Sequence, residues 1–370
     1  MKVEPSSERA TVIVKHFPFY SANFHRRIFL NTLAAAAILA VSACNPGRHR
    51  VLEINYVSAV QATLRDQVAT IYNRVATVKN GERVEVIDHE KRFAKVRTAA
   101  GVEGWIEDRF LVNQKTYDAL QQLTKDNLSD PVQAPGVLRN DTNLHLSPGR
   151  ETEHLYQLTS GAKVSILKRS TAEKAGAVAL PRPGKKEAGP VLEDWWLVRD
   201  AENRVGWVLA RMVDVDAPLD IAQYAEGQRF VAFFVLDTVQ DPNKQDPDKE
   251  DTGKAGSDKS VSQYLCAFTE PHDGSPYDYD QIRVFTWNTH KHRYETAYRE
   301  HGLNGFLPIT VTTENFDKEG TLPVFILHVK DADGNMIERK YKLNTPIVRR
   351  VLAPGEQKEP TPSAKRRHRG

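Results

Sequence analysis

The sequence feature that most constrains the fold is an internal repeat. Residues 60–87 align with residues 140–167 at a constant offset of 80, without a gap. The second copy then carries 22 additional residues, and the offset becomes 102. Matched pairs across the two copies are Leu64 and Leu144, Gly81 and Gly161, Val84 and Val164, Phe93 and Trp195, and Trp105 and Trp207. A chain that repeats one pattern builds the same structural unit twice.

Each copy has the pattern of a small β unit. In each copy a glycine begins the pattern G-x-x-V-x-V, or G-x-x-V-x-I in the second copy. Its period of two is typical of a strand buried on one face. Segments 93–97 and 195–199 predict a second strand, and the Gly-Trp pairs begin a third. Several short strands separated by turns every 8 to 12 residues predict a small barrel or sandwich.

The order of these motifs resembles the bacterial SH3 (SH3b) family. The second copy carries the closer match, in Leu144-His145-Leu146-Ser147-Pro148-Gly149, Leu158-x-x-Gly161-x-x-Val164, Trp195-x-x-Val198 and Gly206-Trp207-Val208. The first copy departs from the pattern, with Leu64-Arg65-Asp66-Gln67 in place of the Ser-Pro-Gly turn and Phe93 in place of the first tryptophan. The resemblance implies tandem SH3-like barrels, which bind extended peptides or cell-wall fragments in a groove lined by aromatic side chains.

The aromatic residues supply the candidate ligand-binding side chains. Trp195 and Trp196 are adjacent on a predicted strand, so they face opposite sides of the sheet. Val198 shares a face with Trp196, and we expect only that tryptophan to fill the small core. Trp195 is therefore predicted to line a groove. Its counterpart Phe93 and the tryptophans of the two Gly-Trp pairs complete the candidate set: Phe93, Trp105, Trp195 and Trp207. The alternative is that all four only close the barrels.

The N-terminus has the features of an export signal. Arg26 and Arg27 precede an apolar run at 28–43, which is short for a membrane span and suits a signal peptide. The run ends in Val-Ser-Ala-Cys, which resembles a bacterial lipobox and implies acyl chains on Cys44. By analogy with Gram-negative lipoproteins, Asn45 then favours an outer-membrane anchor facing the periplasm. The arginine pair leaves the twin-arginine route open, and an uncleaved anchor is the alternative.

We expect a mainly β protein: two small SH3-like β-barrels, a short linker helix and a C-terminal antiparallel β domain. Tyr117, Leu120 and Leu123 lie at helical spacing and predict the linker helix over 114–125. The expected segments are a signal peptide with lipobox at 1–44, a first SH3b domain at 51–113, a linker at 114–134, a second SH3b domain at 135–215 with an inserted loop at 168–190, a C-terminal β domain at 217–353 with a disordered loop at 240–260, and a disordered basic tail at 354–370.

Charge and motifs bear on the partners. Five of the 51 basic and two of the 48 acidic residues lie in 1–44, which leaves 46 of each and does not favour nucleic acid. The Asp331–Asn335 stretch lacks the glutamate of a calcium loop and is interpreted as a hairpin turn. His290, His292 and His301 lack a metal-binding spacing and are interpreted as solvated. We therefore expect no cofactor and no metal.

Cys266 is the candidate nucleophile, because cell-wall hydrolases often pair SH3b domains with a cysteine peptidase. It lies in an apolar strand pattern, without the helix N-terminus or electropositive pocket that activates a thiolate. The leading hypothesis is a non-catalytic, lipid-anchored protein that binds peptidoglycan or an envelope protein. A wall-modifying hydrolase and an assembly component of an envelope complex are the alternatives, and the oligomeric state stays open.

Overall fold

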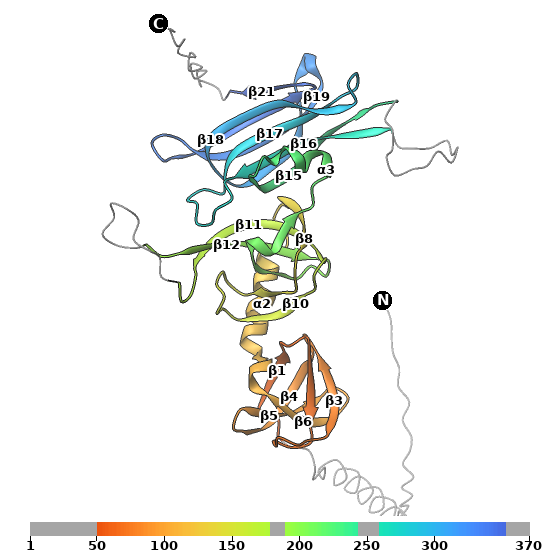
Figure 1. Ribbon diagram of the computed structural model, residues 1–370, viewed down its shortest axis with the longest axis vertical. Helices are drawn as coiled ribbons and strands as arrows, with labels where there is room; N and C mark the ends of the chain where they lie inside the picture. Colours follow the sequence, from red (N-terminus) through yellow and green to blue (C-terminus); the bar gives the residue numbers. More distant parts are fainter. Residues whose placement is uncertain (1–49, 178–188, 243–258, 353–370) are drawn as a thin grey trace, which may run out of the picture. The chain divides into compact units, whose positions relative to one another are not determined.

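The computed structural model describes residues 50–177, 189–242 and 259–352, which form three antiparallel seven-stranded sheets (Figure 1). The predicted fold class, mainly β with two small SH3-like units and a C-terminal antiparallel β domain, is confirmed. The predicted signal peptide at 1–44, with Arg26, Arg27 and Cys44, lies outside the described residues, as does the tail at 354–370. In the described part of the chain, no helix is long and apolar enough to cross a membrane.

The first sheet has the strand order β3-β2-β6-β5-β4-β1-β7. Its strands are β1 (Glu53–Val57), β2 (Gln61–Arg65), β3 (Arg74–Lys79), β4 (Arg83–Glu90), β5 (Phe93–Thr98), β6 (Glu103–Glu107) and β7 (Leu111–Asn113), with the 3-10 helix η1 (Asp108–Phe110) before β7. Side chains alternate between the core and the outer face, as the period of two predicts. The core is built from Val57, Ala62, Leu64, Val78, Val84, Val86, Ala94, Val96 and Ile106.

The second sheet has the equivalent order, β10-β9-β13-β12-β11-β8-β14. Its strands are β8 (Ala134–Leu138), β9 (Thr142–His145), β10 (His154–Leu158), β11 (Lys163–Glu173), β12 (Leu192–Asp200), β13 (Val205–Leu209) and β14 (Val213–Val215), with η2 (Ala210–Met212) before β14. The register repeats as well, since Val86 pairs with Val96 and Ile166 with Val198, each just before a register shift. The two sheets therefore share a strand order and a register.

A close approach explains the repeated Gly-Trp pairs. A Cβ atom on Gly104 would lie 2.8 Å from Leu64 Cβ, and one on Gly206 would lie 2.7 Å from Leu144 Cβ. These leucines are fully buried in their sheets. Only glycine lets β6 and β13 pass this close to β2 and β9.

The linker helix is confirmed as α2 (Gln114–Asp126). It begins at Asn113, whose side chain accepts a hydrogen bond from the Thr116 amide at 2.9 Å and so caps the helix. Tyr117 stacks on Tyr56 of the first sheet with ring centroids 3.9 Å apart. Leu123 packs on the second sheet, so α2 contacts both the first and the second sheet.

The boundaries of the inserted loop need a correction. The prediction that the loop spans 168–190 is wrong at its start, because β11 continues to Glu173 and pairs with the beginning of β12 at Leu192. The prediction ended this strand too early, because Lys168, Arg169 and Ser170 are polar and polar residues usually mark the end of an apolar strand. Residues 178–188 lie outside the described residues, and so do residues 243–258 of the predicted loop 240–260.

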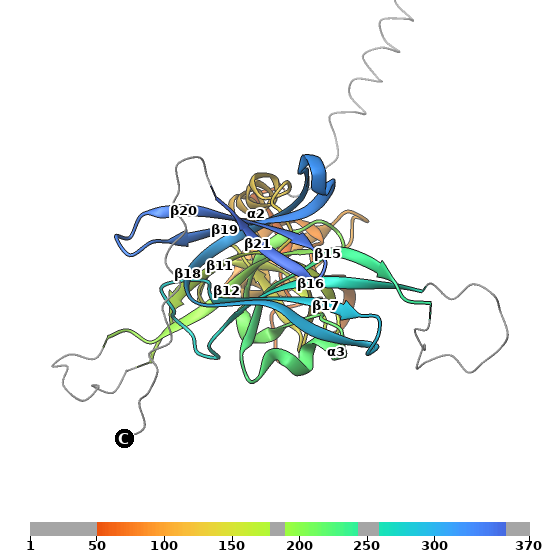
Figure 2. The same ribbon diagram turned by 90° about the horizontal axis from the view of Figure 1, so that it is seen from above.

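The third sheet runs in chain order from β15 to β21 (Figure 2). Its elements are α3 (Leu219–Ala222), η3 (Gln223–Ala225), β15 (Arg229–Gln240), β16 (Ser260–Thr269), β17 (Tyr279–Asn288), β18 (Arg293–Asn315), η4 (Asp317–Glu319), β19 (Thr321–Lys330), β20 (Met336–Asn344) and β21 (Ile347–Val351). The long strand β18 pairs first with β17 and then, beyond Gly305, with β19. The Asp331–Asn335 turn joins β19 to β20, and Asp331 accepts hydrogen bonds from the Asp333 and Asn335 amides, as the hairpin interpretation predicts.

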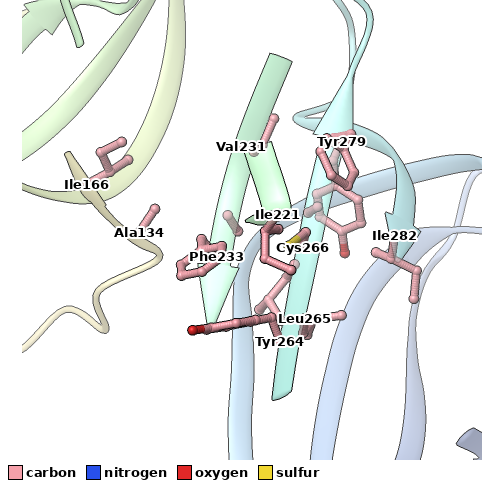
Figure 3. Close-up of a cluster of buried hydrophobic side chains, with 14 of the residues drawn as sticks. Ala134, Ile166, Ile221, Val231, Phe233, Tyr264, Leu265, Cys266, Tyr279 and Ile282 are labelled. Carbon is pink, nitrogen blue, oxygen red and sulfur yellow. The ribbon is translucent and has the colours of Figure 1, made fainter. Parts of the chain in front are cut away.

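The core of the third sheet lies against α3 and extends toward the second sheet (Figure 3). Ile221 of α3 lies beside Val231 and Cys266, which come from β15 and β16. Ala134 and Ile166 of the second sheet belong to the same buried cluster. Burial of this apolar surface stabilises the second and third sheets together, at about 25 cal/mol for each Å² removed from water.

A buried ion network fastens the same two sheets together. Asp194 of β12 is fully buried and accepts hydrogen bonds from Arg169 of β11, Arg229 of β15 and the Gly274 amide. Arg169 also reaches Asp278, with 3.2 Å between Nη1 and Oδ1. One carboxylate therefore joins groups from both sheets.

Candidate functional site

The outer face of the first sheet brings two of the predicted residues together. Arg65 of β2 pairs with Trp105 of β6, and Phe93 of β5 pairs with Glu107 of β6. Residues opposite each other on antiparallel strands share a face, so these four side chains lie on one surface. Tyr72, from the loop before β3, joins them, and we call these five residues the aromatic face.

A cation–π stack organises the aromatic face. The Arg65 guanidinium carbon lies 4.2 Å from the ring centroid of Tyr72 and 5.1 Å from that of Phe93. Its Nη2 atom also lies 3.2 Å from Glu107 Oε1. Phe93 is 5% exposed and Tyr72 is 38% exposed, so of the two rings that stack on Arg65 a ligand can reach Tyr72. Each such contact is worth about 0.5–1 kcal/mol near a surface.

The loop next to the aromatic face presents apolar side chains to solvent. Asp66 closes this loop, because its carboxylate accepts hydrogen bonds from the Asn73 amide and side chain at 2.9 and 2.8 Å. These bonds hold the pKa of Asp66 below its usual value. Within the closed loop Ile71 is 85% exposed, and Val75 just beyond it is also exposed. The aromatic face is therefore bordered by two exposed apolar side chains.

The equivalent surface of the second sheet is covered. The outer-face residues Lys95 and Glu103 of the first sheet correspond to Leu197 and Val205 in the second. These two apolar residues pack with Trp207 against Leu123 of α2. The predicted ligand residue Trp207 therefore packs on the same apolar cluster as Leu123 of the linker helix, whereas Trp105 lies opposite Arg65 and Lys95.

Trp195 is also covered, which corrects the groove prediction. Trp195 and Trp196 are each 2% exposed, so Trp195 does not line an open groove. Trp196 lies in the core with Val198 as predicted, while the outer-face Trp195 lies edge-on to His145 with ring centroids 5.2 Å apart. The Nε1 atom of Trp195 has no hydrogen-bond partner among the described residues.

The loop after β9 is fastened over this part of the second sheet. Arg150 makes two hydrogen bonds to Glu193 of β12, at 2.7 and 2.6 Å, and lowers the pKa of that carboxyl. His145 Nδ1 lies 3.1 Å from Thr152 Oγ1. Burial and the nearby His154 lower the pKa of His145 to about 4, so its ring is neutral at pH 7.

The sequence did not single out Arg65, Tyr72 or Glu107. Arg65 corresponds to His145 in the repeat, and a comparison of the two copies would have marked it as a cation beside Trp105. Tyr72 lies in the loop where the first copy departs from the Ser-Pro-Gly pattern. No sequence periodicity predicts that this loop folds back onto Arg65.

Cys266 is fully buried on β16, and burial raises the pKa of its thiol. It pairs with Phe233 on one side and Arg283 on the other, within the cluster drawn in Figure 3. A buried, protonated thiol has neither the access nor the ionisation that a nucleophile needs.

Two further predictions concern metal ligands. His292 is less solvated than expected, because its Nδ1 lies 2.7 Å from Oδ2 of the buried Asp241, which also accepts a hydrogen bond from Trp287. Across the described ranges, no group of three or more histidine, cysteine, aspartate or glutamate residues is arranged to hold a metal ion.

Comparison with known families gives one match. Residues 61–112 match the family model described as "Bacterial SH3 domain". This stretch runs from β2 into β7 and contains all five residues of the aromatic face. A search of curated proteins found no match.

Solved structures similar to this chain include an NlpC/P60 family protein from Bacillus cereus ATCC 10987. It is 12% identical, and the match covers 47% of this chain and 62% of that protein at a TM-score of 0.21. This chain therefore spans less than two thirds of it. NlpC1 and NlpC2 from Trichomonas vaginalis are each 11% identical, at TM-scores of 0.14 and 0.16. They cover 48% and 82% of this chain and 52% and 97% of their own.

Proposed function

We propose that this protein is a non-catalytic binding protein of the bacterial cell envelope, in which the first SH3-like unit carries the ligand site. The observation that carries the proposal is the aromatic face: an arginine stacked on two aromatic rings, within the stretch that matches the bacterial SH3 model. Aromatic grooves of SH3 domains bind extended peptides. The ligand we propose is peptidoglycan or an extended segment of an envelope protein.

We further propose that the second unit is a tandem SH3b copy with a structural role. Its strand order and register repeat those of the first unit, which supports common descent. Its outer face is apolar where that of the first unit is charged, and α2 covers it. The second unit thereby fixes α2 and the third sheet, and the first unit keeps its face free for a ligand.

The proposal places the protein at the outer membrane, facing the periplasm, through acyl chains on Cys44. Its support is the sequence alone: Arg26 and Arg27 before the apolar run, the Val-Ser-Ala-Cys ending, and Asn45 after the cysteine. Mass spectrometry of the protein from its native membrane tests this proposal. Processing at Cys44 with an added acyl mass supports the anchor, and an intact N-terminus contradicts it.

Binding of purified peptidoglycan by the full-length protein tests the ligand proposal. Arg65→Ala removes the stacked cation, and Tyr72→Ala removes its exposed ring. We expect each to weaken binding by about tenfold, because stacked arginine and tyrosine residues are typical hot spots. Arg83→Ala is the matched control, since Arg83 is an exposed arginine of the same sheet that pairs with Glu85.

The outcomes separate the ligands. Retention on peptidoglycan that depends on Arg65 and not on Arg83 supports the wall ligand. Co-purification of one stable envelope protein, lost in the same two variants, supports the protein ligand or the assembly role. Retention by neither peptidoglycan nor envelope extracts contradicts the proposal.

The alternative is a cell-wall hydrolase, and Cys266 is the cysteine available to it in the described chain. Zymography on cell-wall substrate distinguishes the two classes. Clearing that is lost in Cys266→Ala would establish the enzyme. The buried position of Cys266 leads us to expect no such dependence.

A further inference from the structure

A pocket of about 270 Å³ lies where the second and third sheets meet, away from the aromatic face. The linker before β8 contributes Asp130 and Pro131, and β11 contributes Lys168 and Arg169. The third sheet contributes Asp278 and the segment around Pro308, where β18 is not paired with β19. Two leucines complete the apolar part of the lining. Residues from four separate segments of the chain therefore build one pocket.

The charged groups of the pocket are balanced. Lys168 Nζ lies 2.7 Å from Asp130 Oδ2, and Arg169 Nη1 lies 3.2 Å from Asp278 Oδ1. Asp130, Arg169 and Asp278 have side chains that are at most one fifth exposed. A ligand with one net charge would leave an uncompensated charge in this partly buried site, which is unfavourable. A ligand that carries both charges would not.

Both ends of such a ligand find unused hydrogen-bonding capacity. The Lys168 ammonium has three donors, one of which hydrogen-bonds the Asn127 side chain, while its Nζ also forms the ion pair with Asp130. The Asp278 oxygens accept from Arg169 and from the Leu307 amide, and each oxygen has a second lone pair. One donor and several acceptor positions therefore remain.

The volume of the pocket also limits the size of the ligand. A volume of 270 Å³ corresponds to about nine water-sized groups at about 30 Å³ each. Leucine, with nine non-hydrogen atoms, fills such a space. The prolines and leucines of the lining give an alkyl side chain an apolar surface on which to pack.

We infer that this pocket binds a small zwitterion, an apolar amino acid or the equivalent end of a short peptide. The carboxylate of the ligand accepts from Lys168, and its ammonium group donates to Asp278. The alkyl side chain lies between Pro131 and Pro308. This site is separate from the aromatic face, so either one can fail without the other.

Titration of the purified full-length protein with leucine, followed by calorimetry or ligand-observed NMR to about 10 mM, tests the inference. N-acetylleucine lacks the ammonium group and leucinamide lacks the carboxylate, and we expect neither to bind detectably. Lys168→Met should weaken leucine binding by about tenfold. Lys163→Met is the matched control, since Lys163 lies on the same strand with a side chain that is 82% exposed.

Asp278→Asn tests the other end of the ligand and should also weaken binding by about tenfold. The far-ultraviolet circular dichroism of each variant checks that it folds. If Asp278→Asn does not fold, Lys168→Met carries the test. Leucine binding that depends on Lys168 and not on Lys163 supports the inference. No binding of leucine, or equal binding of its blocked forms, overturns it.

Discussion

Removal of the Asp194 carboxylate should uncouple the second and third sheets. Asp194 is fully buried and receives three donors, from Arg169, Arg229 and Gly274. Asp194→Ala leaves two guanidinium groups without this acceptor. Breaking a buried ion pair by removing one partner costs about 3–5 kcal/mol, because the remaining charge stays buried.

The contacts that both arginines keep place the expected loss for Asp194→Ala at the lower end of that range. Arg169 is 4% exposed but keeps Asp278 at 3.2 Å and the Tyr277 carbonyl at 2.9 Å. Arg229 is 23% exposed and keeps Asp273 at 2.9 Å. Each arginine retains part of its compensation, so we expect a loss of about 3 kcal/mol in the free energy of unfolding.

Urea unfolding monitored by tryptophan fluorescence and circular dichroism measures this loss. Asp214→Ala is the matched control, because it makes the same substitution in the second sheet. Its partner is Arg139, and both side chains are more than half exposed. The control should cost less than about 1 kcal/mol, and added salt should reduce its effect further. In Asp194→Ala we also expect the two optical signals to separate, because the sheets no longer unfold together.

An Asp194→Ala variant that is no less stable than Asp214→Ala would refute this reasoning. It would show that the apolar contact between the sheets holds them without the ion network. Asp194→Asn gives an independent check, because it keeps one oxygen acceptor and removes the charge. Its loss should lie between those of the other two variants.

Three further predictions concern other parts of the chain. The pKa of His145 is lowered from 6.5 to about 4, so the folded protein binds a proton at this ring less readily than the unfolded chain does. The free energy of unfolding should therefore fall by about 2 kcal/mol as the pH drops from 6.5 to 4, with partial exposure of the ring taken into account. Urea unfolding at both pH values should show a smaller fall in His145→Gln. Gly206→Ala places a Cβ atom 2.7 Å from a buried leucine and should cost about 2 kcal/mol in thermal unfolding, whereas Gly189→Ala, which meets nothing within 4 Å, should cost almost nothing. Cys266 should react with a thiol reagent only at the rate of unfolding, and rapid labelling of the folded protein would contradict its buried position.

Local patterns were sufficient to predict much of the fold. The spacing of Tyr117, Leu120 and Leu123 predicted a helix over 114–125, and α2 spans Gln114–Asp126. The repeat offset predicted two units of one topology. The sequence does not predict the full length of β18, because its glycine and proline residues resemble a turn. The sequence does not predict β21 either, because it is a short edge strand with no buried residue.

The candidate site shows where pattern reasoning stops. The sequence gives the order of residues along each strand and hence the face on which Phe93 and Trp195 lie. It does not give what packs on that face from elsewhere in the chain. Leu123 of α2 closes the second surface, and Tyr72 folds back onto the first. Exposure of an aromatic residue is therefore a tertiary property, even where strand and register are local ones.

The same limit explains why Arg169 and Asp194 were not recognised. Charged residues in a strand are normally interpreted as solvent-facing. Here the loop at 270–278, which is itself rich in polar residues, glycine and proline, covers them and supplies the Ser275 and Tyr277 carbonyls as acceptors. Two polar segments that each look exposed in sequence bury one another when they meet. A comparison of the two units shows a local trace of this contact: Thr171 pairs with Asp194 where β11 and β12 extend beyond their counterparts in the first sheet, whose pairing ends at Glu90 and Phe93.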